Sequence, residues 1–238
     1  RGAELVRPLV LTTDVVVIGS GAGGASLASA VSRAGRQVIV LEEGEYHRAS
    51  DFNQREGDML PRLFQDGGGR QTTDGAVTIL SGRGAGGSTT HNTNLCKRAP
   101  AEILDRWVHE HGAEGWSASA LDADYAAIES ELGVTPIVED EVNAHNAPIR
   151  RGAQALGFAG GLLQHNRRGC ARSGFCELGC AFDAKQNALK VLLPEVLARG
   201  GTLACGMHAT AIVVQRGRAV AVRGYAVRPS GERGVEFT

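Results

Sequence analysis

The stretch from Val15 to Gly44 constrains the fold more than any other part of this 238-residue chain. Its residues, VVVIGSGAGGASLASAVSRAGRQVIVLEEG, are typical of a strand, a glycine turn, a helix and a second strand. The apolar run Val15–Ile18 suits a parallel strand that helices bury on both faces. Gly35 stands where a glycine should end the helix. The pattern therefore predicts a βαβ unit over residues 13–44.

Three glycines in this turn, Gly19, Gly21 and Gly24, follow the order G-x-G-x-x-G. The first allows a tight turn, the second lets a pyrophosphate approach the main chain, and the third lets the helix pack against the strand. Glu42 ends the second strand, where a carboxylate can accept hydrogen bonds from a ribose, and the adjacent Glu43 is an alternative. The unit is thus expected to bind an adenine dinucleotide. FAD or NAD is favoured over NADP, because an acid disfavours a ribose phosphate.

Charge and hydropathy exclude several classes of function. The net charge of −1 gives no electrostatic footprint for nucleic acid. No apolar run reaches the ~20 residues that span a bilayer, and the segment RGAELVRPLVLTT lacks the features of a signal peptide. The chain begins with Arg1 rather than Met, which is consistent with a start that lies upstream. We expect a cytoplasmic protein with no nucleic-acid partner and no transmembrane segment.

A second glycine-rich stretch, ILSGRGAGGSTTHNTNLCKRAP, follows a polar loop over residues 45–78. A chain so dense in glycine, followed by small donors, can lie flat against a large planar ligand and offer it N–H and hydroxyl groups. The alternative is a flexible surface loop. The stretch contains Gly82, Gly84, Gly86 and Gly87, then the hydroxyls of Ser88, Thr89 and Thr90, and then His91 and Asn92.

The remaining sequence predicts helices and one strand pair. Apolar residues at helical spacing predict core-facing helices over about residues 101–112, 119–133 and 145–156, with Ser119 as an N-cap, within a helical insertion over 100–160. His109 and His111 are expected on the solvent side of the first of these. Residues 165–200 carry three cysteines and end in a helix, and 201–238 read as a strand pair joined by QRGR. The fold class expected is α/β: a Rossmann-like parallel sheet with helices on both faces, a helical insertion and an antiparallel strand pair.

Several of these motifs together resemble the glucose–methanol–choline (GMC) oxidoreductases, in the long-chain-alcohol oxidase-like branch. The motifs are the GSGAGG turn with LEEG, the GRGAGGSTTHN loop, and GCARSGFCELGCAFDAKQ followed by LLPEVLARGG. The resemblance runs from about Thr13 to Ala226 and implies FAD as the cofactor. It implies that Gly19, Gly21 and Gly24 hold the pyrophosphate and that Glu42 holds the ribose. It also implies that six residues of the second glycine loop line the flavin: Gly82, Gly86, Gly87, Ser88, Thr89 and Asn92. Ala209 corresponds to a position whose main chain meets the adenine.

The resemblance has two departures. His91 stands where the family loop has an aliphatic residue, so it either lies near the isoalloxazine edge or points away from it. Family members are about twice as long, and their catalytic base lies in the C-terminal half, beyond the position of Thr238. No catalytic residue is therefore assigned in this chain.

The resemblance implies oxidation of an alcohol CH–OH group, with hydride passed to flavin N5. This chain would supply the flavin-binding half of the enzyme, and the catalytic base would lie in a missing C-terminal half. The fragment alone is expected to be inactive. The alternatives are an FAD-binding module without catalysis of its own and an NAD-dependent dehydrogenase. The implied partners are a small-molecule alcohol and an electron acceptor.

Cys170, Cys176 and Cys180 lie close together in the chain, and the last two are four positions apart, which predicts one face of a helical turn. Their spacing resembles that of flavin dehydrogenases in this superfamily that carry a three-iron iron–sulfur cluster. Thiol packing and a zinc site are the alternatives. Cys96 and Cys205 lie outside this spacing and are expected to be structural.

Overall fold

The computed structural model describes residues 1–228 and 230–238. It divides into two compact units. Unit 1 comprises Arg1–Thr93 and Cys170–Thr238, and unit 2 comprises Asn94–Gly169.

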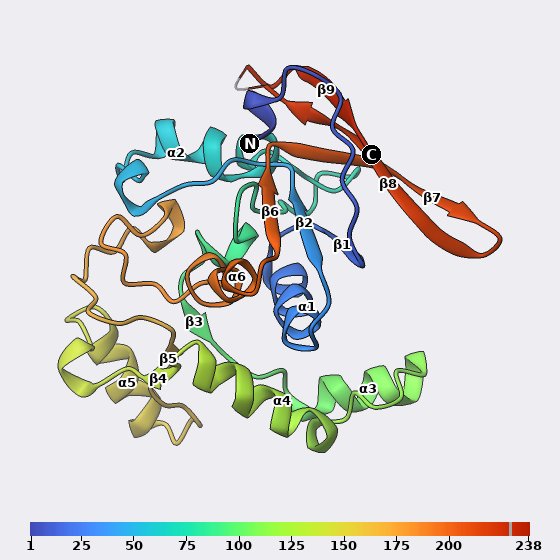
Figure 1. The fold of residues 1–238 in the computed structure, drawn as a ribbon. Coiled ribbons are helices and arrows are strands. Elements are labelled where there is room, and N and C mark those ends of the chain that lie inside the picture. Colours follow the sequence, from blue (N-terminus) through green and yellow to red (C-terminus); the bar gives the residue numbers. More distant parts are fainter. Residues whose placement is uncertain (229) are drawn as a thin grey trace. The chain divides into compact units, whose positions relative to one another are not determined.

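Unit 1 is built on a parallel sheet in the order β1-β2-β6 (Figure 1). The expected βαβ unit is present, with β1 at Val15–Ile18, α1 at Ala22–Arg33 and β2 at Val38–Glu42; β6 is Thr202–Cys205. Gly35, at φ 78°, lies just past the end of α1, as the sequence predicts. One expectation is wrong: β1 is not buried on both faces, because it is an edge strand whose Val16 and Ile18 are exposed.

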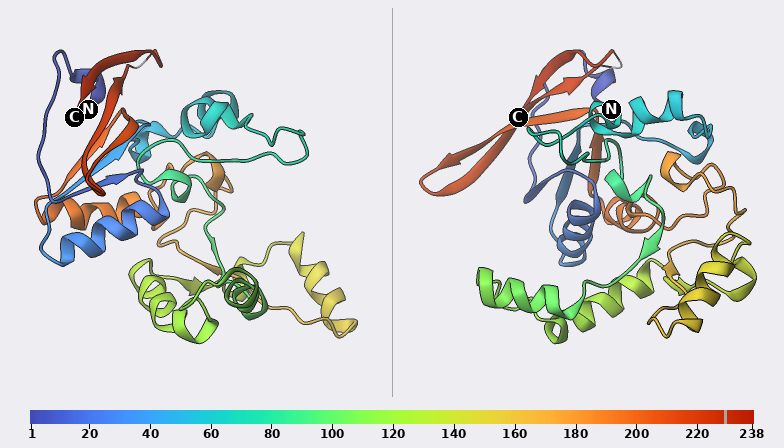
Figure 2. Two further views of the ribbon diagram at one scale, coloured as in Figure 1. Left: turned by 90° about the vertical axis from the view of Figure 1, so that its right-hand side faces the viewer. Right: turned by 180° about the vertical axis from the view of Figure 1, so that it is seen from behind.

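Helices α1 and α6 (Ala188–Ala198) pack side by side on one face of this sheet (Figure 2). Their small and aliphatic residues meet Val17, Val38 and Val40, all nearly inaccessible to solvent. The α/β class is confirmed, but helices do not cover both faces. An antiparallel sheet covers the other face, through an apolar cluster formed by Leu41, Met207, Ala226 and Phe237.

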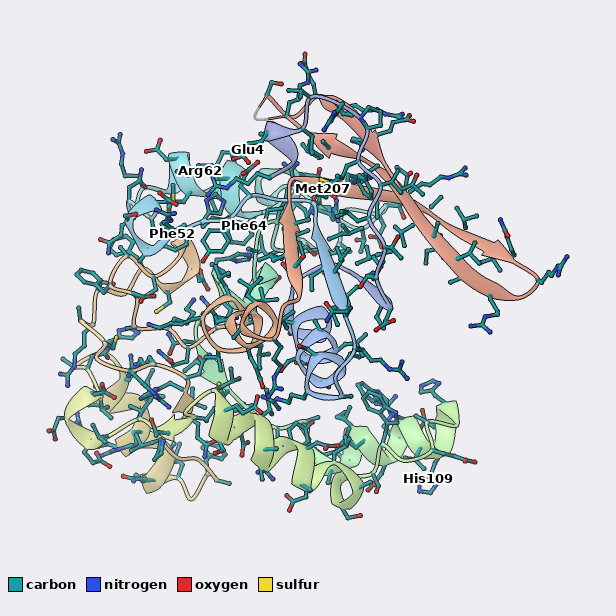
Figure 3. The ribbon with its side chains drawn as sticks, in the orientation of Figure 1. Glu4, Phe52, Arg62, Phe64, His109 and Met207 are labelled. Atoms are coloured by element: carbon teal, nitrogen blue, oxygen red, sulfur yellow. The ribbon has the colours of Figure 1, made fainter. Side chains whose placement is uncertain are left out.

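The antiparallel sheet contains β7 (Met207–Gln215), β8 (Arg218–Val227) and β9 (Arg233–Phe237). The expected hairpin is present, and its turn places Arg216 and Gly217 at φ 49° and 77°. The apolar run before it is not one strand, because the chain turns at Gly206 (φ 70°) and passes from β6 in one sheet to β7 in the other. Met207 lies at this turn (Figure 3).

The polar stretch after β2 is more ordered than a loop. It contains α2 (Glu56–Leu63) and the 3-10 turns η2 (Ala49–Asp51) and η3 (Gln65–Gly68), and η1 (Gly2–Glu4) opens the chain. Phe52 and Phe64 lie beside α2 (Figure 3). Both belong to a second apolar cluster, with Met59, Leu63 and Leu178.

Unit 2 holds three helices and a small sheet in the order β3-β5-β4. The helices are α3 (Ala101–His111), α4 (Ala118–Glu131) and α5 (Asn146–Ala155); the other elements are β3 (Leu95–Cys96), β4 (Thr135–Pro136), η5 (Glu139–Glu141) and β5 (Gln164–His165). Ser117 rather than Ser119 caps α4, because its hydroxyl accepts the Ala120 N–H. The helices are not core-facing as expected, since only Leu104 of α3 is buried among them. His109 projects from α3 into solvent, as predicted (Figure 3).

Candidate cofactor-binding site

The turn between β1 and α1 requires glycine for two measurable reasons. Gly19 has φ 89°, a conformation that favours glycine. A Cβ on Gly24 would lie 2.0 Å from the Gly19 carbonyl oxygen, so only glycine lets α1 approach the strand this closely. Gly21 is the N-cap residue of α1. The free N–H groups of the first helical turn therefore start at this glycine, where the helix dipole favours an anion.

The second glycine loop packs directly on the first. Gly87 has φ 52°, and a Cβ there would lie 2.7 Å from the Gly21 Cα. The preceding residue, Gly86, has φ 87° and donates its N–H to the Ser20 hydroxyl at 3.1 Å. The 3-10 turn η4 (Gly87–Thr89) follows at once. This stretch is thus an ordered wall of a site and not a flexible surface loop.

The Glu42 carboxylate joins the two loops. One oxygen accepts the Ser20 N–H at 3.1 Å and the Ser20 hydroxyl at 2.6 Å. The other accepts the N–H groups of Gly44 at 2.9 Å and Gly84 at 3.2 Å. Glu42 is buried, and four donors occupy a group with about four acceptor positions. Its charge is therefore satisfied by the protein itself.

Glu43 lies in a different environment. It is about one-third exposed and pairs with Arg83, Nε to Oε1, at 3.1 Å. Its second oxygen lies 2.9 Å from Nδ1 of His208, whose ring stacks on Tyr225. No sequence signal marked His208, because its partners come from distant parts of the chain.

A cavity of about 490 Å³ opens between the two loops, the end of β2 and the start of β7. Eight of the eleven residues predicted to bind the cofactor line it: Gly19, Gly21, Glu42, Gly82, Gly87, Ser88, Thr89 and Ala209. Glu43 and His208 line it as well. Gly24 and Gly86 lie behind the wall, where they allow close packing, and the Asn92 side chain is exposed.

The hydroxyl groups of the second loop mostly hold the loop itself. Thr89 donates to the Gly86 carbonyl at 2.6 Å, and Thr90 donates to the Ala85 carbonyl at 3.0 Å. Ser88 accepts the Gly82 N–H at 2.8 Å, a bond that does not use its own proton. Of these three hydroxyls, Ser88 is therefore the one that can donate into the cavity.

Lys185 is a structural residue that the sequence did not reveal. It is 2% exposed, and its ammonium donates to the carbonyls of Thr90 at 3.2 Å, Asn92 at 2.5 Å and Cys176 at 2.7 Å. Burial lowers the pKa of this amine to about 8, although the nearby Cys176 and Cys180 thiols oppose the shift. Lys185 thus ties the second glycine loop to the cysteine-bearing segment.

His91 points into the protein and is not among the residues that line the cavity. It is 4% exposed, and its ring packs on Phe64 with the centroids 4.1 Å apart. Its Nε2 lies behind Gly82 and has no hydrogen-bond partner in the described part of the chain. Burial lowers the pKa of His91 to about 4, so this histidine is neutral at pH 7.

The three clustered cysteines are half-buried. Cys176 lies in the 3-10 turn η6 (Cys176–Leu178), and Gly179 (φ 84°) turns the chain before Cys180, so the two do not share a helical turn as predicted. The Cys180 sulfur accepts the Ala184 N–H at 3.2 Å, and the Cys170 sulfur accepts the Arg172 N–H at 3.3 Å. Among the described residues, no three His, Cys, Asp or Glu side chains are placed to hold a metal ion. The iron–sulfur cluster and the zinc site therefore stay predictions, without a ligand set among the described residues.

The other two cysteines lie elsewhere. Cys205 is buried, and burial raises the pKa of its thiol to about 12. Cys96 belongs to unit 2, where burial raises its pKa as well. Both thiols are therefore protonated near neutral pH.

The fold and the paired glycine loops define a nucleotide-binding α/β domain of the flavoprotein kind. The sequence profile of the GMC oxidoreductases matches residues 60–234, and the chain belongs to that family as one of its FAD-binding domains. It is 28% identical to the long-chain-alcohol oxidase FAO3 of Arabidopsis thaliana, over 85% of this chain and 27% of the relative. It is 32% identical to an uncharacterized GMC-type oxidoreductase of Mycobacterium tuberculosis, over 94% of this chain and 36% of the relative.

The solved structures agree on the fold. Pyridoxine 4-oxidase from Mesorbium loti superposes with a TM-score of 0.67 at 17% identity, over 94% of this chain and 48% of that one. The chain thus spans less than half the length of the relatives it matches. No helix in the described part of the chain is long and apolar enough to cross a membrane.

Proposed function

We propose that this chain holds FAD in the cavity between its two glycine loops. The observation that carries the proposal is the contact of Gly21 with Gly87, which brings the pyrophosphate-binding turn and the second loop to one site. The residues fit the group: Gly21 and Ala22, at the start of α1, line the cavity where a helix N-terminus favours an anion, and a Cβ on Gly87 would clash with Gly21.

Each part of the cavity has a proposed role. Gly19 makes the tight turn beside the pyrophosphate, Gly21 lets the pyrophosphate approach the main chain, and Gly24 sets the distance of α1 from the strand. Gly82, Gly87 and Ser88 line the flavin, with Thr89, Gly86 and Asn92 holding their loop, and the main chain of Ala209 meets the adenine. Because four donors already occupy Glu42, a ribose hydroxyl would share one of its oxygens or bind Glu43, which lines the same cavity.

In the complete enzyme we propose oxidation of an alcohol CH–OH group. When bound, FAD would supply the hydride acceptor, N5. The chain's own part is to orient the cofactor, and to offer the Ser88 hydroxyl as a fixed donor where negative charge develops on it. The base that takes the hydroxyl proton is proposed to lie in the C-terminal half found in the relatives, so that this chain alone is inactive. FAO3, by its name, acts on long-chain alcohols, which makes an aliphatic alcohol the first substrate to test.

Binding is tested by titrating the purified chain with FAD and following the quenching of flavin fluorescence. The Gly24→Ala variant should lose most of this binding, because its Cβ would overlap the Gly19 carbonyl. Gly23→Ala is the matched control in the same helix, since nothing lies within 4 Å of its Cβ position. The proposal fails if NAD but not FAD binds, or if Gly24→Ala folds and binds FAD as tightly as Gly23→Ala.

The alcohol chemistry is tested separately, by anaerobic addition of an aliphatic alcohol to the FAD-bound protein. Two FAD-bound proteins are compared: this chain alone, and this chain joined to the C-terminal half of a relative. The proposal is supported if the alcohol bleaches the flavin absorption band of the joined protein but not that of this chain alone. If the joined protein binds FAD but no alcohol reduces its flavin, the alternative of an FAD-binding module without catalysis is favoured. Iron and sulfide assays on the same anaerobic sample test the iron–sulfur prediction, and a negative result would leave thiol packing as the role of the three clustered cysteines.

A further inference from the structure

A histidine and a carboxylate lie side by side in the wall of the cofactor cavity. His208 is the second residue of β7, Glu43 follows the last residue of β2, and both line the cavity. Nδ1 of His208 lies 2.9 Å from Oε2 of Glu43. Because the same carboxylate forms an ion pair with Arg83, it is ionised and can only accept a hydrogen bond. Nδ1 therefore carries the proton, and the other ring nitrogen, Nε2, is a bare acceptor whenever the imidazole is neutral.

The antiparallel sheet holds the His208 ring in place. His208 lies directly opposite Tyr225 across β7 and β8, and the two rings stack with their centroids 4.8 Å apart. The guanidinium of Arg233, on β9, lies 4.9 Å from the centre of the Tyr225 ring and continues this row of contacts. Cross-strand pairs of this kind fix side chains on one face of a sheet. The ring face and Nδ1 of His208 are thus engaged, whereas its Nε2 has no hydrogen-bond partner among the described residues.

The place of this pair in the cavity selects the part of FAD that it can meet. The start of α1 is the proposed pyrophosphate site and the second glycine loop is the proposed flavin wall, which leaves the end of β2 and the start of β7 for the adenosine. Ribose hydroxyls bind carboxylates at the end of β2. The donor that remains on the adenosine is the exocyclic amine of adenine, where guanine and hypoxanthine carry an acceptor oxygen. His208 directly precedes Ala209, whose main chain is proposed to meet the same base.

We propose that His208 selects adenine as the base of the cofactor, by accepting a hydrogen bond from its exocyclic amine at Nε2, in a tautomer that Glu43 fixes. His208 has this role only if the cavity holds FAD, so the inference rests on the proposed function. His208 is the specificity-determining residue, and Glu43 is a positioning residue that acts through it. A base with oxygen in place of the amine would bring an acceptor against the bare Nε2 and leave both atoms without a donor, which costs more than the loss of one hydrogen bond.

Titration with two dinucleotides tests the choice of base. The probes are FAD and flavin hypoxanthine dinucleotide, in which an oxygen replaces the adenine amine, and binding is followed by flavin fluorescence. This chain should bind FAD at least about tenfold more tightly than the hypoxanthine analogue. His208→Ala should lower this preference by at least about fivefold, whereas His109→Ala, on the exposed surface of α3, should keep it.

The outcomes separate this role of His208 from the proposed function. If FAD binds and the preference is the same in His208→Ala as in wild type, the role of His208 is overturned and the FAD site stands. If neither dinucleotide binds to the wild-type chain, the proposed function fails, and the role of His208 fails with it.

Replacing Glu43 separates the choice of tautomer from mere support of the wall. The amide of Glu43→Gln can donate as well as accept, so Nδ1 of His208 can become the acceptor while Nε2 carries the proton and donates to the oxygen of hypoxanthine. The preference for FAD should therefore narrow or reverse in this variant. An equal loss of affinity for both dinucleotides would overturn the positioning role of Glu43.

Nitrogen NMR of the isotope-labelled, cofactor-free chain reads the tautomer directly, because protonated and bare ring nitrogens differ in chemical shift. At a pH where the ring is neutral, His208 should show a protonated Nδ1 and a bare Nε2. A protonated Nε2 would overturn the proposal, and this measurement needs no variant to fold.

Discussion

His91 is a buried residue whose neutral form the fold requires. Its pKa is about 4 in the folded protein and about 6.5 in an unfolded chain, so between these values the unfolded state binds more protons. The free energy of unfolding should therefore fall by about 3 kcal/mol as the pH drops from 7 to 4. Replacing His91 by Leu, which keeps the packing against Phe64, should remove this part of the pH dependence.

Urea unfolding of both proteins at pH 4.5 and 7 measures the difference. Some dependence should remain, because burial also lowers the pKa values of His47 and His165. His109→Leu, on the exposed surface of α3, is the matched histidine-to-leucine control. Identical slopes for His91→Leu and wild type would show that His91 does not titrate in this range.

Glu42 and Glu43 provide a second test at the residue scale. Glu42→Gln places an amide NH₂ against N–H donors in a buried site, so it should lower the stability of the cofactor-free chain by about 2–3 kcal/mol. Glu43→Gln, at a partly exposed position, should cost less than about 1 kcal/mol. Thermal unfolding without FAD checks both, and a smaller loss for Glu42→Gln than for Glu43→Gln would contradict the joining role of Glu42.

At the scale of elements, Lys185 connects the second glycine loop to the segment that carries Cys176. Lys185→Met leaves three carbonyls without their donor and should cost about 3 kcal/mol, with weaker FAD binding. Lys190→Met is the matched control in the same region, since the Lys190 side chain is partly exposed and its ammonium pairs with Asp183. Thermal unfolding and FAD titration should show a larger loss of stability and of FAD affinity for Lys185→Met than for Lys190→Met. Equal losses in the two variants would show that the three carbonyl bonds of Lys185 do not hold the loop in place.

The elements also show what the sequence could predict. The β1–α1–β2 unit was predictable because its signals are local: a backbone at positive φ at Gly19, a close approach at Gly24, and a helix stop at Gly35. The role of Lys185 was not, because its acceptors at Thr90 and Asn92 lie far away in the sequence. Of the eight predicted residues around the cavity, motif spacing indicated Gly19, Gly21 and Glu42, and the family resemblance supplied the rest. His208 could not be predicted, because only the fold brings it to the cavity.

At the scale of the whole molecule, the proposed cofactor site needs unit 1 alone. The chain enters and leaves unit 2 side by side, since Leu95 pairs with His165 and the Asn166 N–H bonds to the Asn94 carbonyl at 3.3 Å. Replacing residues 97–163 with a short Gly-Ser linker should therefore leave FAD binding unchanged in fluorescence titration. A shortened chain that is folded by circular dichroism but does not bind FAD would show that unit 2 contributes to the site.

The order of strands in the parallel sheet has a consequence for folding during synthesis. Strand β2 lies between β1 and β6, and roughly 160 residues separate Glu42 from its partner Cys205. At about 5–20 residues per second, β2 leaves the ribosome roughly ten to thirty seconds before its second neighbour. Throughout that time Val38, Val40 and Leu41 lack their final cover, and parallel pairing over such a distance is intrinsically slow. The nascent chain is thus expected to depend on chaperones until β6 has been made.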